Sequence, residues 1–142
     1  MLKNLHDKFA PVIERLFAQY SPADIRITMR RVLAPYLKQY ADLIPRGIRQ
    51  AVDDGELSGL SVKCETFRDQ LDHTAAEREE SGATALELQR FEHTGIILEA
   101  ISYLDSQRFS KESLFNFFYC MGVFDSDDRL IEQFENPART RG

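Results

Sequence analysis

Arg68 and His73 are the residues whose types and spacing best suit catalysis, because only four residues separate a phosphate-binding group from a proton carrier. A guanidinium binds a phosphate through parallel hydrogen bonds, and an imidazole takes up or releases a proton near neutral pH. Such a pair could cleave a phosphodiester bond without a metal ion. On a helical wheel His73 lies nearly opposite Phe67 and Leu71, so we expect its side chain to be exposed.

This spacing resembles the Arg-x4-His motif of the small helical ribonucleases of the HEPN superfamily. The resemblance implies that Arg68 would bind the phosphate and that His73 would assist attack by the 2′-hydroxyl across a dimer interface. It rests on this one motif together with chain length and helix content. Ala75 stands where one branch of the superfamily often has Tyr. A metal-independent ribonuclease is therefore one alternative function for the chain.

Other signatures of catalysis or cofactor binding are missing from the sequence. There is no GxGxxG and no GxxxxGK[ST] motif, and the glycines do not cluster as a phosphate-binding loop requires. The three histidines, His6, His73 and His93, are too few for a five-histidine di-iron site, and no Glu-x-x-His pair is present for the carboxylate type. We therefore expect no cofactor and no metal site, and a non-enzyme is favoured over an enzyme.

Basic side chains on the second predicted helix form the second alternative. Arg26, Arg30 and Arg31 flank its apolar stripe and could contact the phosphates of a nucleic acid. Residues 1–52 have a net charge of +5 and residues 53–142 one of −10. This asymmetry fits a polyanion site, head-to-tail self-association, or halves that neutralise each other in space. The sequence pI of about 5.2 argues against strong binding to nucleic acid.

Aromatic residues crowd the segment 114–124 and carry the leading hypothesis. They cover more of a helix circumference than one core contact requires, so either the helix is fully buried or part of it contacts another chain. The residues that we expect to bind a partner are Phe115, Phe118, Tyr119 and Phe124. We expect a non-enzymatic adaptor, regulator or chaperone-like protein that binds another protein, with a homodimer as one form of the complex.

Apolar residues recur at three- and four-residue steps through most of the chain, a spacing typical of amphipathic helices. This pattern predicts helices over residues 2–20, 22–44, 45–55, 60–82, 84–104, 110–121 and 127–135. Ser21, Thr84 and Ser110 stand at positions typical of N-caps, and Gly55 can end the third helix in a left-handed conformation. Kinks are expected at Pro11 and Pro35, although the first helix could instead begin near Ala10. A strand over 59–67 is the alternative for the start of the fourth helix.

The sequence therefore predicts an all-α fold, a single compact bundle of about five to seven helices over residues 1–136. Residues 137–142 are expected to form a flexible tail. No run of 18 apolar residues and no secretory signal is visible, so we expect a soluble cytoplasmic protein with no membrane partner. Cys64 and Cys120 are too few for a disulfide framework and are expected to be free thiols.

Overall fold

The structure, a computed structural model, describes the backbone of residues 2–136 and the side chains of residues 7–136. Over these residues it is all-helical and contains no strand, which confirms the predicted fold class and rules out the alternative strand at 59–67. The predicted tail, residues 137–142, lies outside the described residues. The seven helices are α1 (Leu2–Gln19), α2 (Pro22–Gln39), α3 (Arg46–Asp54), α4 (Leu60–Glu80), α5 (Ala85–Ser102), α6 (Lys111–Met121) and α7 (Asp127–Glu135).

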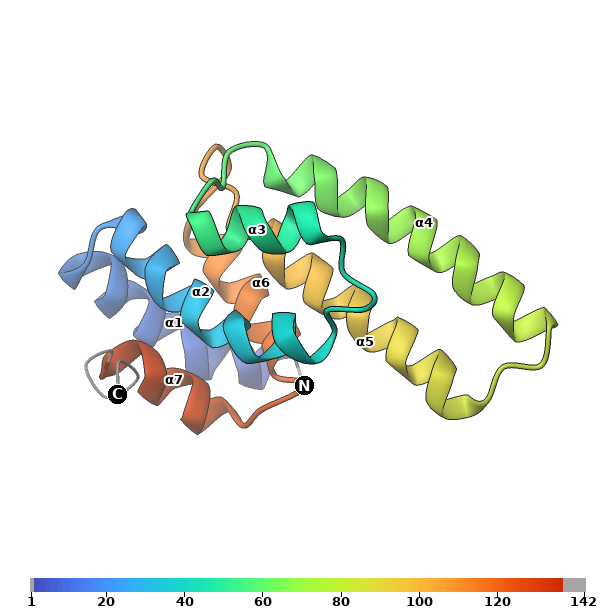
Figure 1. The fold of residues 1–142 in the computed structure, drawn as a ribbon. Coiled ribbons are helices and arrows are strands. Elements are labelled where there is room, and N and C mark those ends of the chain that lie inside the picture. Colours follow the sequence, from blue (N-terminus) through green and yellow to red (C-terminus); the bar gives the residue numbers. More distant parts are fainter. Residues whose placement is uncertain (1, 137–142) are drawn as a thin grey trace.

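A long antiparallel hairpin of α4 and α5 dominates the outline of the molecule (Figure 1). The other helices gather around the C-terminal half of α5, whereas the far end of the hairpin projects away from them. Between Leu71 on α4 and Thr94 on α5 no residue is buried. We call this segment, residues 72–93, the arm.

Short polar side chains begin most of the helices, as the sequence predicts. The hydroxyls of Ser21 and Thr84 accept hydrogen bonds from the backbone N–H groups three residues later, and Ser110 exchanges such bonds reciprocally with Ser113. Gly55 ends α3 with a φ of 74°, a left-handed conformation that favours glycine. Local sequence therefore sets where these helices begin and end.

The two internal prolines do not interrupt their helices. Helix α1 begins at Leu2 and runs through Pro11, so the alternative start near Ala10 is wrong. Helix α2 likewise runs through Pro35. The kinks at these two positions stay predictions.

The core lies around the C-terminal half of α5. Ile97, Leu98, Ile101 and Leu104 have no exposed surface. Aromatic rings from other helices complete the core, with Phe9 of α1 stacked on Phe118 of α6 at 4.6 Å between ring centroids. The described apolar residues of all seven helices join one continuous core cluster.

Candidate functional site

Arg68 faces α5 and is held there by an ion pair. Its Nη1 donates a hydrogen bond to Oε1 of Glu99 at 2.7 Å. The Arg68 side chain passes beside Gly95, where an added Cβ would lie 3.8 Å from Nε, an ordinary van der Waals distance.

Glu99 joins Arg68 to a third helix, because its other oxygen accepts a hydrogen bond from Sγ of Cys120 on α6 at 2.9 Å. Partial burial opposes ionisation of Glu99, but the hydrogen bonds from Cys120 and Arg68 hold its pKa below the usual value. Burial, followed by the bond to Glu99, raises the pKa of the Cys120 thiol. A thiol held protonated is a poor nucleophile, so this cluster joins helices and is not suited to attack a substrate.

His73 is exposed, as expected, and the structure does not bring it to Arg68 within one chain. Five residues along a helix correspond to a rotation of about 140°. The Arg68 guanidinium is occupied by Glu99 on the face toward α5, whereas His73 points to solvent from the arm. The ribonuclease alternative stays a prediction, and it requires Arg68 to leave Glu99 before it can bind a phosphate.

The basic residues of α2 have separate surroundings. Arg30 donates from Nε to the carbonyl oxygen of Val52 and from Nη2 to that of Asp53, both at 2.6 Å. It therefore caps the C-terminus of α3. The guanidinium of Arg26 lies over the Phe109 ring, 5.1 Å from its centroid. A nucleic-acid contact through Arg26, Arg30 and Arg31 stays a prediction, although backbone carbonyls already use two of the donors of Arg30.

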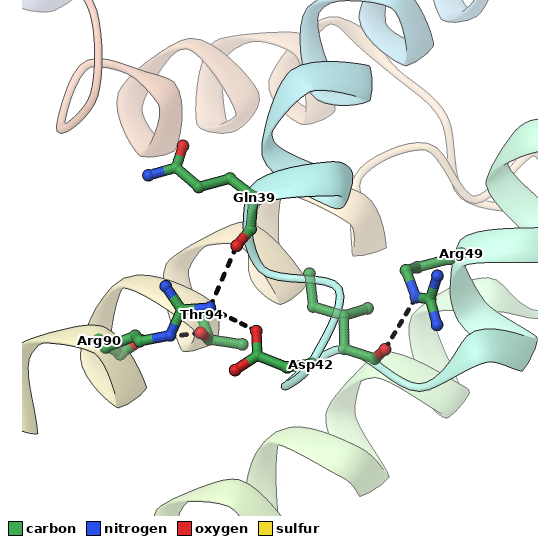
Figure 2. Close-up of polar contacts among 6 residues, drawn as sticks. Gln39, Asp42, Arg49, Arg90 and Thr94 are labelled. Atoms are coloured by element: carbon green, nitrogen blue, oxygen red, sulfur yellow. Dashed lines mark hydrogen bonds and ion pairs between the residues drawn. The ribbon is translucent and has the colours of Figure 1, made fainter. Parts of the chain in front are cut away.

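Arg90 makes several long-range contacts that sequence reasoning missed. Figure 2 shows its guanidinium directed at the carbonyl of Gln39 and the carboxylate of Asp42, with which it forms an ion pair. It also lies over the Tyr40 ring, 4.9 Å from the centroid. Since Gln39 is the last residue of α2, Arg90 fastens the end of that helix to the base of the arm. These partners lie far from Arg90 in sequence, so no local sequence pattern predicts the contacts.

The turn between α2 and α3, which Arg90 contacts at its start, is also held at its end by a hydrogen bond. Arg49 Nε donates to the carbonyl of Ile44 at 3.0 Å, and Thr94 Oγ1 donates to the carbonyl of Arg90 at 2.7 Å (Figure 2). Arg49 thus fixes the exit of the turn into α3. A hollow of about 360 Å³ borders Asp42 and is lined mainly by side chains of α4. Because the contacts of Arg90 and Arg49 join segments of the backbone, we interpret the cluster as structural.

The aromatic segment divides into a buried side and a surface side. Leu114, Phe117 and Phe118 are fully buried, so the prediction that Phe118 binds a partner is wrong. Its ring packs between Phe9 and Phe134. The helical wheel carries this signal, because Phe118 shares the face of Leu114, one turn earlier.

Phe124 also lies mostly inside the fold. Its ring is half-buried and contacts the rings of Tyr36, Tyr40 and His93 at centroid distances of 5.1, 6.4 and 5.2 Å. Burial, with Asp125 nearby, raises the pKa of Tyr36. Phe124 is therefore a weaker candidate for a partner contact than the exposed residues of α6.

Three apolar side chains spaced four residues apart make the surface side, which we call the α6 face: Phe115, Tyr119 and Val123. Tyr119 is 49% exposed and Val123 is 51% exposed. Phe115 is half-buried and borders a hollow of about 410 Å³ between α1 and α6, where Ala10 and Ile13 supply more apolar surface. Sequence analysis identified Phe115 and Tyr119 but missed Val123, which follows the end of the helix.

Groups that could hold a metal are missing from the described residues, where no three His, Cys, Asp or Glu side chains come together. Cys64 and Cys120 are free, as predicted, and both are buried. Within residues 2–136 no helix has the length and apolar character needed to cross a membrane.

Comparison with protein-family models, curated proteins and solved structures found no match to this chain.

Proposed function

We propose that this protein is a non-enzymatic adaptor, regulator or chaperone-like protein that binds another protein through the α6 face. The observation that carries the proposal is the pair of exposed apolar side chains, Tyr119 and Val123, next to the apolar hollow that half-buried Phe115 borders. Exposed aromatic residues gathered in one place are typical of the centres of protein interfaces, and tyrosine is enriched among the residues that contribute most to binding. The hollow next to Phe115 offers a place for an apolar side chain of the partner.

The partner is another protein or a second copy of this chain. Lys111 and Glu14, which both line the hollow, form an ion pair at 2.9 Å, and Glu112 adds one further negative charge to the rim. We place the interaction in the cytoplasm, where thiols such as Cys64 and Cys120 stay reduced.

Site-specific photo-crosslinking tests this proposal in the native host cell. A photoreactive phenylalanine at Tyr119 is expected to give one discrete adduct, whose mass identifies either a partner or a second copy. The additional substitution Val123→Asp should abolish the adduct, because it places a charge on the apolar face one turn from Tyr119. The same photoreactive residue at Leu86, which is 77% exposed on the arm, is the matched control. No adduct at Tyr119, or the same adduct at Leu86, would contradict the proposal.

A further inference from the structure

A pocket distinct from the α6 face lies where the end of α1, the first half of α2 and the end of α7 meet. Its volume is about 210 Å³, below the roughly 300 to 1,000 Å³ typical of sites for drug-sized molecules. The apolar part of its lining comes from all three helices: Leu16, Ile25, Ile27 and Phe134. Leu16, Ile25 and Phe134 are almost fully buried, so they form a floor of the hydrophobic core.

Thr28 is the buried polar residue of this lining, and its hydroxyl lacks an internal partner. The side chain is 93% buried, since 7% of its surface is exposed, and among the described residues no hydrogen bond reaches its Oγ1. Threonines elsewhere behave differently: Thr74 and Thr94 each donate to the carbonyl four residues earlier. Among the described residues every fully buried side-chain nitrogen or oxygen has a hydrogen-bond partner, so the unpaired Thr28 hydroxyl must reach the surface of the pocket, where a ligand can bond with it.

Two charged side chains border the same pocket without an ion-pair partner in residues 7–136. They are Asp24 and Arg31. Arg31 differs in this from Arg30, Arg68 and Arg90, whose donors are used by carbonyls or carboxylates. Tyr20 adds a further hydroxyl that forms no internal hydrogen bond there. The polar groups of the pocket are therefore available to a ligand.

Helix geometry sets the distance between the two charges. Asp24 and Arg31 are seven residues apart on one face of α2, which corresponds to about 10 Å along the helix axis. They are too far apart to pair with each other, and Ile27 and Thr28 lie between them. Three residues of an extended peptide span about the same length, at roughly 3.3 to 3.6 Å per residue.

From this arrangement we propose that the pocket binds a small zwitterionic ligand of the size of a tripeptide. Its ammonium group would meet the carboxylate of Asp24, and its carboxylate would meet the guanidinium of Arg31. Its apolar middle would lie on Ile25 and Phe134, with one polar group hydrogen-bonded to Thr28. The opposite charges at the two ends fix the direction in which the ligand lies.

Nuclear magnetic resonance titration of the full chain with the tripeptide Ala-Leu-Ala tests the proposal. The free tripeptide should shift the amide resonances of residues 24–31 in a saturable manner. Its N-acetylated and C-amidated forms should each bind at least about tenfold more weakly, because each lacks one charge. Absence of saturable shifts with the free tripeptide would refute the site. Equal binding of the blocked forms would refute the zwitterionic ligand.

Variants assign each charge to its partner. Asp24→Asn should remove the preference for a free amino group, and Arg31→Gln the preference for a free carboxylate. Lys38→Gln on the same helix and Asp69→Asn on α4 are the matched controls, and both should bind like the wild type. If either control loses the preference to the same degree, the proposed pairing is wrong.

Thr28→Val separates a ligand-binding role from a structural one. Because the Thr28 hydroxyl makes no internal bond, this nearly isosteric change should leave the denaturation midpoint unchanged or raise it, while weakening tripeptide binding severalfold. Thr94→Val, which removes the bond to the Arg90 carbonyl, should lower the midpoint and leave tripeptide binding unchanged. Thr28→Val with undiminished binding would overturn the assignment of this hydroxyl to the ligand.

Discussion

Asp105 accepts two hydrogen bonds from Ser61 through a single carboxylate oxygen, Oδ2, which lies 3.0 Å from the backbone nitrogen and 2.7 Å from the hydroxyl. Its other oxygen, Oδ1, accepts from the backbone N–H groups of Gly59 and Gln107 at 3.2 and 3.0 Å. Helix α4 starts after Gly59 and has no side-chain cap of its own. A buried carboxylate that follows α5 therefore supplies the N-cap of α4.

Replacing this carboxylate should destabilise the whole fold. Asp105→Ala leaves several donors without a partner at a position that is only 2% exposed. We expect the free energy of unfolding to fall by about 3 kcal/mol, as measured by urea denaturation. The control Asp69→Ala removes an exposed carboxylate with no ion pair and should change it by less than about 0.5 kcal/mol. Similar losses in both variants would contradict the capping role.

The same carboxylate should make stability depend on pH in the acid range. Burial opposes its ionisation, but the hydrogen bonds from Ser61, Gln107 and Gly59 hold the pKa of Asp105 below its usual value. A depressed pKa contributes stability that is present above the unfolded-state pKa of about 3.9 and is lost as the pH falls through the folded-state pKa. The difference in unfolding free energy between the wild type and Asp105→Asn should therefore shrink as the pH is lowered from 6 to 2. A constant difference would show that ionisation of Asp105 does not contribute.

Three glycines near α3 allow backbone strain and steric contact to be measured separately. Gly55→Ala introduces both backbone strain and a close contact, since φ is 74° and the new Cβ would lie 3.2 Å from Nη1 of Arg30. We expect it to lower the unfolding free energy by about 1 to 2 kcal/mol. Gly59 has the same φ with open space around it, so Gly59→Ala should lower the unfolding free energy by less than Gly55→Ala does. Gly47→Ala, inside α3 with open space, should raise the unfolding free energy by about 0.5 to 1 kcal/mol. Any other order in the thermal midpoints would contradict this account.

Arg90→Met should loosen the turn between α2 and α3. The substitution removes the donors to Gln39 and Asp42, and because these groups are well exposed we expect a global loss of only about 1 kcal/mol. Hydrogen exchange of the amides in residues 40–44 should accelerate more than exchange in α6. Arg78→Met, on the arm and without an ion pair, is the control. Unchanged exchange in the turn would show that Arg49 alone holds it.

Sequence reasoning predicted the helices well because their signals are local. Apolar spacing at three and four residues fixed the core-facing sides, and Ser21, Thr84, Ser110 and Gly55 marked boundaries that the structure confirms. Which aromatic residues of segment 114–124 are exposed was predicted less well, since composition alone does not distinguish buried Phe118 from exposed Tyr119. Their positions on the helical wheel do separate them.

Pairs distant in sequence could not be predicted. Asp105 with Ser61, Arg90 with Asp42 and Arg68 with Glu99 are separated by 44, 48 and 31 residues. Each forms only after α4 and α5 fold against each other and the loops at their base come together. The same holds for the pocket of Thr28 and Arg31, whose floor needs Phe134 from the last helix.

The arm is the part of the molecule that should unfold locally most easily. None of its 22 residues is fully buried and its core contacts lie at its base, near Phe91, so opening the tip around Gly82 loses little apolar contact and leaves the core around Ile97 and Ile101 intact. A protease should therefore nick the tip first while the remainder stays folded, and a fluorescent domain inserted at Gly82 should be tolerated. The tip thus offers a place to label or immobilise the protein at a distance from both proposed binding surfaces.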